Sequence, residues 1–166
     1  MRTQSGNYFR NQIHLKKTHH RWYVLANRTA AVFYEDLPDQ PFLFVDRMKN
    51  PKGHLTEGQL DSDRPGSNVS SAGAGTIHHG TDRRFHHHEQ VAATFARNIA
   101  MKLQTLKSEK KFDELIIVAE PHFLGLLRNE LSQEVRSLVS FEVNREYIEG
   151  SDLEMRDAIL KSISKK

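Results

Sequence analysis

Residues 115–119 read LIIVA, and this aliphatic run decides the fold class. Five consecutive apolar residues are typical of a strand that is covered on both faces, as in a parallel sheet. A helix is predicted on each side of it. Residues 85–107 carry apolar side chains mostly three or four positions apart, with basic residues between them. Pro121 begins the second helix, because proline suits a first helical turn. Helix, buried strand and helix in succession predict an α/β domain.

Three short apolar and aromatic runs upstream predict a meander of antiparallel strands. They are WYVLA at 22–26, AAVFY at 30–34 and FLFVDRM at 42–48, with turn residues between them. Downstream, residues 140–144 predict a further strand and residues 151–163 a last helix. The element order is therefore βββαβαβα. We expect a mixed five-stranded sheet with three helices, in the order used by ribonuclease H-like folds.

The beginning of the chain is basic. The first acidic residue is Glu35, and residues 1–34 carry a net charge of +6. An acid-free segment with interleaved aromatic residues is suited to neutralising phosphates and stacking bases. We expect a flexible basic arm over residues 1–20 and a single domain over residues 21–166. The candidate RNA contacts of the arm are Arg10, Lys16, Lys17 and Arg21. A solvated extension without a ligand is the alternative, and a transit peptide is a further one.

Composition limits the setting in which the protein works. The chain has 166 residues and no cysteine, which excludes disulfides and suits a reducing compartment. No stretch approaches 18 consecutive apolar residues, and the first residues lack the apolar core of a secretory signal. We therefore expect a cytoplasmic protein without a membrane span.

Residues 49–82 predict a long loop rich in glycine and serine. Its most biased part, residues 61–81, contains Gly66 and three further glycines and cannot bury enough apolar area to offset the entropy of ordering. Loops of this length in compact domains are often functional. The alternative is a solvated connection without chemistry.

Ten histidines raise the hypothesis of a metal-dependent hydrolase. The candidate ligands are His78, His86 and His88. A catalytic zinc needs three protein ligands at one point, and no two histidines are four positions apart. His86 and His88 would converge only on an extended segment. We expect neither a metal nor a cofactor.

The predicted order of elements also raises the hypothesis of a two-metal nuclease, which needs several converging carboxylates. The first strand and its turn have no carboxylate, and Asn27 stands at the turn instead. The acidic residues that could still approach one another are Asp46, Glu89 and Glu120. Because the first strand provides no carboxylate, the sequence argues against a two-metal nuclease. Elsewhere, Gly125 is expected to allow a neighbouring backbone to approach its helix.

Five segments together resemble a known family. They are WYVLANRTAAVF at 22–33, LDSDRPGSN at 60–68, FARNIAMKL at 95–103, LIIVAEPHFLGLLRNEL at 115–131 and FEVNREYIEGSDLEMRDAI at 141–159. The chain is similar in these segments to the bacterial host attachment proteins, bacterial relatives of the archaeo-eukaryotic release factor middle domain. The resemblance covers about residues 21–163. It implies a fold like the middle domain of release factors and Pelota.

The resemblance also implies partners and site residues. In release factors, a Gly-Gly-Gln loop between the third strand and the first long helix helps water attack the peptidyl-tRNA ester. This chain has only Gly58-Gln59 in that loop, so Gln59 is the candidate catalytic residue and enzymatic activity stays open. The other candidate RNA contacts are Asp61, Asp63, Arg64, Gly66 and Arg128. The implied partner is the ribosome or tRNA. The alternative is a non-catalytic interaction protein that acts in attachment through a protein partner.

Overall fold

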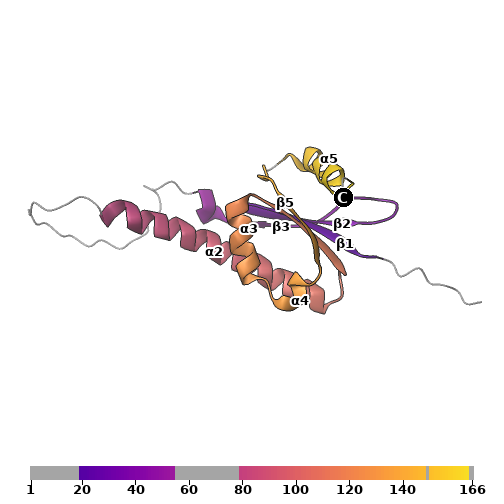
Figure 1. Ribbon diagram of the computed structural model, residues 1–166, viewed down its shortest axis with the longest axis horizontal. Coiled ribbons are helices and arrows are strands. Elements are labelled where there is room, and N and C mark those ends of the chain that lie inside the picture. The colour runs from indigo at the N-terminus through magenta and orange to yellow at the C-terminus, as the bar shows by residue number, and fades with distance from the viewer. Residues whose placement is uncertain (1–18, 55–78, 149, 165–166) are drawn as a thin grey trace, which may run out of the picture.

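A single mixed sheet forms the centre of the molecule. The computed structural model describes residues 19–54, 79–148 and 150–164. The strands are β1 (Arg21–Ala26), β2 (Ala30–Asp36), β3 (Leu43–Lys49), β4 (Glu114–Ala119) and β5 (Val139–Asn144). Their order in the sheet is β3-β2-β1-β4-β5 (Figure 1). β1, β2 and β3 pair antiparallel, whereas β4 runs parallel to both β1 and β5. The predicted mixed five-stranded sheet is confirmed.

Four α-helices and a short 3₁₀ helix complete the described chain. They are η1 (Pro51–His54), α2 (His79–Ser108), α3 (Pro121–Glu130), α4 (Gln133–Arg136) and α5 (Asp152–Ile163). The three predicted helices are present, and the prediction missed α4. This helix has only four residues and forms because the Ser132 side chain accepts a hydrogen bond from the Val135 amide. It is too short to produce a recognisable apolar period.

The helices cover the two faces of the sheet unequally. α2, α3 and α4 pack on one face and α5 on the other (Figure 1). Alternate residues of each strand point to opposite faces. Trp22, Val24 and Ala26 of β1 therefore pack against α2 and α3, while Tyr23 and Leu25 pack on the side of α5. All five residues of the LIIVA run are fully buried, as the sequence predicts for a strand covered on both faces.

Two local expectations are wrong. Nothing in the described chain lies within 4 Å of a Cβ built on Gly125, so this glycine permits no close approach. α2 begins at His79, so about four residues of the expected 49–82 loop belong to the helix instead. No helix that the structure describes is both long enough and apolar enough to cross a membrane.

Candidate nucleic-acid interface

The parallel strands β1, β4 and β5 end at the same side of the sheet, which we call the carboxyl edge. It comprises residues 27–29, 120–122 and 145–147, which follow those strands, together with η1. In open α/β sheets, ligands bind outside the carboxyl ends of the strands where the chain turns to opposite sides. β1 continues to β2 on one side, and its parallel neighbour β4 continues through α3 to β5 on the other, so the two strands meet this condition. Figure 1 shows α2 projecting beyond the sheet at this end, next to η1.

Asn27 organises the turn after β1. Its Oδ1 accepts hydrogen bonds from the Thr29 amide at 2.8 Å, the Thr29 hydroxyl at 2.8 Å and the Ala30 amide at 2.9 Å. Its Nδ2 donates to the Tyr147 carbonyl at 2.7 Å. One side chain thus closes the β1–β2 turn and ties it to the segment after β5. The site where a nuclease would need a carboxylate is occupied by a structural amide.

The 3₁₀ helix η1 packs directly against the same turn. The Asn50 amide donates to the Thr29 carbonyl at 2.7 Å, and Asn50 Nδ2 donates to the Arg28 carbonyl at 2.8 Å. A Cβ on Gly53 would stand 2.3 Å from that Arg28 oxygen. Only glycine fits this contact, so η1 and the turn form one unit.

Three exposed cations at this edge have no partner in the part of the chain that the structure describes. They are Arg28, Lys52 and Arg145, which we call the edge cations. Every other arginine whose side chain is described is engaged, mostly by a carboxylate. These are Arg21, Arg47, Arg97, Arg128, Arg136 and Arg156. The Arg145 amide donates to the Ala119 carbonyl at 3.0 Å, which holds this residue at the end of β4.

Two of the carboxylates considered for a nuclease, Glu89 and Glu120, are engaged at this edge, whereas Glu146 beside Arg145 is exposed. Glu120 caps α3, accepting hydrogen bonds from the His122 amide at 3.0 Å and the Phe123 amide at 2.8 Å. His122 Nε2 lies 3.0 Å from Glu89 Oε2 of α2. Glu89 and Glu120 therefore both lie next to His122. They are two of the three acidic residues that were considered for a nuclease site. Asp46 does not join them, because it pairs with Lys102 at 2.5 Å.

The histidine hypothesis finds no geometry to support it. His86 and His88 both lie in α2, where residues two apart point roughly 200° apart around the axis. Among the described residues, no three His, Asp or Glu side chains are placed to hold a metal ion. His78 lies outside the described residues.

Two predicted RNA contacts are neutralised within the fold. Arg128 forms a two-pronged pair with Glu142, in which its Nε lies 2.9 Å from both carboxylate oxygens. Arg21 is part of β1, not of a flexible arm, and its Nε donates to Glu114 Oε2 at 2.8 Å. Burial alone would lower the pKa of Arg21, but the hydrogen bond with Glu114 leaves it raised. The remaining candidates lie outside the described residues, namely Arg10, Lys16, Lys17, Gln59, Asp61, Asp63, Arg64 and Gly66.

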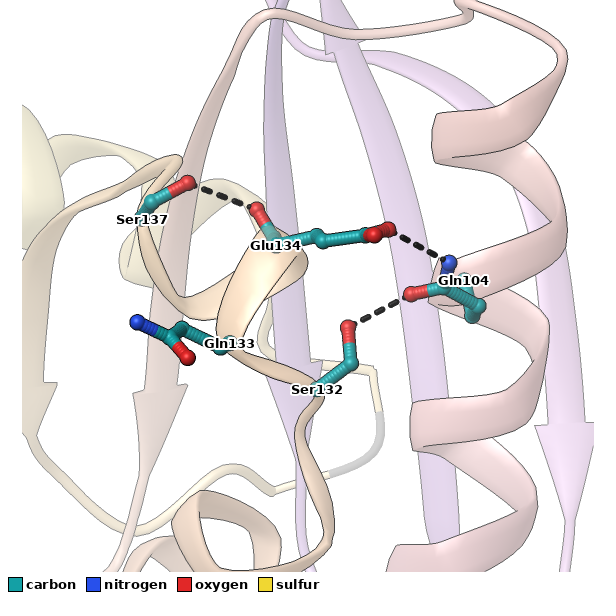
Figure 2. Close-up of a pocket in the computed structure, with 5 residues that line it drawn as sticks. All are labelled: Gln104, Ser132, Gln133, Glu134 and Ser137. Carbon is teal, nitrogen blue, oxygen red and sulfur yellow. Dashed lines mark hydrogen bonds between the residues drawn. The ribbon is translucent and has the colours of Figure 1, made fainter.

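A shallow polar pocket lies between α2 and α4, and its groups satisfy one another (Figure 2). Ser132 Oγ donates to Gln104 Oε1 at 2.5 Å, and Gln104 Nε2 donates to Glu134 Oε2 at 3.0 Å. Lys107 adds an ion pair to Glu134 at 2.9 Å. The pocket therefore links two helices and offers a ligand little unsatisfied polarity.

Sequence reasoning missed the edge cations, although a signal was present. Asn-Arg follows β1 at Asn27-Arg28, and Asn-Arg again spans the end of β5 at Asn144-Arg145. Two strands that each end in Asn-Arg place both arginines at one edge only if the strands are parallel. That relation becomes visible in the fold and not in the sequence.

Comparisons with known proteins agree with the sequence resemblance. Residues 22–159 match the family model described as "Protein required for attachment to host cells". No curated protein matches the chain. Among solved structures, an archaeal protein matches with a TM-score of 0.42 and 9% identity, over 90% of this chain and 39% of that one. The archaeal translation termination factor aRF1 matches with a TM-score of 0.42 and 8% identity, over 90% of this chain and 40% of that one. The chain spans about two fifths of the length of both structures.

Proposed function

Because the chain belongs to the family of proteins required for attachment to host cells, we propose that it serves attachment by binding RNA. The partner that we propose is the ribosome or a transfer RNA. The observation that carries the proposal is the pair Arg28 and Arg145 at the carboxyl edge, both exposed and without a side-chain partner among the described residues. The family description states a cellular requirement, and RNA binding is a molecular activity that could meet it.

The edge cations suit a phosphate backbone. Arginine presents a planar fork of donors that matches phosphate oxygens, and lysine adds a point charge. Arg28, Lys52 and Arg145 offer these groups without first breaking an ion pair within the described chain. Three phosphate contacts to a single strand predict a slope of about −2 for log K against log salt.

The predicted contact regions lie at different ends of the sheet. The predicted arm, residues 1–20, ends where β1 begins, whereas the edge cations lie at the carboxyl end of β1. β1 has six residues, so these ends are separated by roughly 20 Å. One RNA that uses the arm and the carboxyl edge must reach along the whole sheet.

We propose binding and not peptidyl-tRNA hydrolysis. The Gly-Gly-Gln sequence that release factors use is absent, and Gly58-Gln59 is the nearest match. Catalysis of that kind would require water to be positioned by a Gly-Gly-Gln motif, which this sequence lacks.

Ribosome co-sedimentation across a salt series tests the proposal. Native protein should sediment with ribosomes at low salt and dissociate as salt rises. A variant with Arg28→Ala and Arg145→Ala should bind at least tenfold more weakly, because each loses a charge-assisted contact. The matched control replaces Lys111 and Lys161 by alanine, two exposed lysines without described partners.

Three results would overturn the proposal. These are no binding at low salt, an equal loss in both variants, or equal affinity for heparin and for RNA of the same length. The last result would point to a general polyanion surface.

A second candidate function is favoured by the surface of α5. Leu153 and Leu160 of α5 are large apolar residues with exposed fractions of 71% and 42%. Exposed apolar residues gathered on one element are typical of protein contacts. We propose them as the contact for a protein partner if RNA binding fails. Salt-insensitive partner binding that Leu153→Ser abolishes would support this reading.

A further inference from the structure

We propose that Asn27 is a positioning residue that holds the turn carrying Arg28 against the segment carrying Arg145. The carboxyl edge then engages two phosphates of one strand that lie fewer than three nucleotides apart. The inference rests on the proposed RNA binding and deepens it. It names the ligand as an oligonucleotide strand that carries at least two phosphates, in preference to a mononucleotide or a single phosphate.

The spacing follows from the register of the sheet. Ala26 of β1 pairs with Ala119 of β4, and Ala119 pairs with Asn144 of β5. The ends of β1 and β5 are therefore separated by two strand spacings, about 10 Å. Arg145 follows the end of β5 directly, and Arg28 follows the end of β1 after Asn27. The rise of roughly 3.4 Å per phosphate is measured along the helix axis, and successive phosphates of one strand lie farther apart than this rise. A separation of about 10 Å therefore spans fewer than three nucleotides.

The spacing is held because the segment carrying Arg145 is fixed at several points. The Arg145 amide is bound to Ala119, and the Tyr147 ring is 1% exposed within the core beneath α5. The Tyr147 hydroxyl also donates to Asp152 Oδ1 at 2.9 Å. Asn27 Nδ2 then joins the Tyr147 carbonyl to the turn that carries Arg28. This amide thus forms a side-chain bond between the two arginine-bearing segments.

Fluorescence anisotropy with labelled oligouridine of two, four and eight nucleotides tests the inference on the full chain. For the native protein, affinity should rise steeply between two and four nucleotides, because a dinucleotide reaches only one arginine. Arg28→Ala and Arg145→Ala should each weaken the octanucleotide about tenfold and the dinucleotide no more than about twofold.

Asn27→Ser isolates the positioning role. Serine retains an oxygen that can accept the turn hydrogen bonds but lacks the amide donor to Tyr147. The variant should bind the octanucleotide about tenfold more weakly and leave dinucleotide affinity within about twofold. Asn129→Ser, on the exposed surface of α3 and without a described bond, should change neither. Thermal unfolding shows whether each variant is folded.

The outcomes separate this inference from the proposed function. If the native chain binds no oligonucleotide, the proposed function fails. If it binds, but affinity rises evenly with length or Asn27→Ser weakens all lengths equally, the positioning inference alone is wrong. Should Asn27→Ser fail to fold, the length dependence of the two arginine variants still decides whether two phosphates are engaged together.

Discussion

Gly53→Ala should destabilise the protein and also weaken the proposed RNA binding. The added Cβ would stand 2.3 Å from the Arg28 carbonyl oxygen and 3.0 Å and 3.1 Å from two further backbone atoms of the turn. Ordinary contacts of this kind are at about 3.5 Å or more, so the backbone must move by roughly 1 Å. No side-chain rotation relieves the clash, because the atoms belong to the main chain. Overpacking of this size costs about 1–3 kcal/mol.

The displacement of η1 should break a specific contact with the turn. If η1 moves away from the turn, the hydrogen bond from Asn50 Nδ2 to the Arg28 carbonyl is lost. This loss accounts for about 1 kcal/mol of the destabilisation. Arg28 then loses the support that η1 provides. We therefore expect lower free energy of unfolding and several-fold weaker binding of an oligonucleotide.

Urea denaturation followed by tryptophan fluorescence measures the first effect. Trp22 is the single tryptophan of the chain and is buried under α2, so its emission reports loss of the core. Gly125→Ala is the matched control. No atom lies near its added Cβ, and alanine in a helix interior should stabilise by about 0.5–1 kcal/mol. A Gly53→Ala protein as stable as the native one, with unchanged binding, would refute the reasoning.

Four further predictions concern the fold. Leu127→Ala removes a fully buried side chain and should lower the unfolding free energy by about 2–5 kcal/mol in urea denaturation. Asp152→Asn weakens the contacts that dock α5, so hydrogen exchange in α5 should accelerate before exchange in the sheet. Burial, and then a neighbouring carboxylate, raises the pKa of Tyr23 to about 12. A spectrophotometric titration should show this phenol ionising well above the usual range. The contribution of Tyr23 to the free energy of unfolding should be complete below pH 10 and lost as the pH rises from 10 to 12. Burial raises the pKa of Glu114, but the hydrogen bonds it accepts outweigh burial and lower that pKa below 4.5. Its contribution is present above pH 4.5 and lost as the pH falls, and Glu114→Gln should remove that part of the acid dependence of unfolding.

Secondary structure was predictable where its signal is local. Three signals each depend only on neighbouring residues. They are the LIIVA run, the three- and four-residue spacing in residues 85–107, and Pro121. Each of these elements is therefore readable without knowing its neighbours, and the structure confirms them. The helix α4 lacked such a signal, since four residues make only one turn.

Charge was a poorer guide to the site. Arg21 and Arg128 stood out in the sequence, yet each is neutralised by a carboxylate that is distant along the chain, Glu114 or Glu142. Arg28 and Arg145 did not stand out, because they are 117 residues apart and neither belongs to a cluster. Whether a cation is free depends on which carboxylate the fold brings to it.

The amino-acid sequence by itself determined which strands and long helices follow one another along the chain, because periodicity and turn chemistry act over a few residues. The tertiary structure alone decided which segments meet at the carboxyl edge. Parallel pairing of β1, β4 and β5 gathers three chain segments at one side, and Asn27 joins two of them through a bond across 120 residues. Such contacts leave no local pattern in the sequence, because their partners come together only after the sheet has formed.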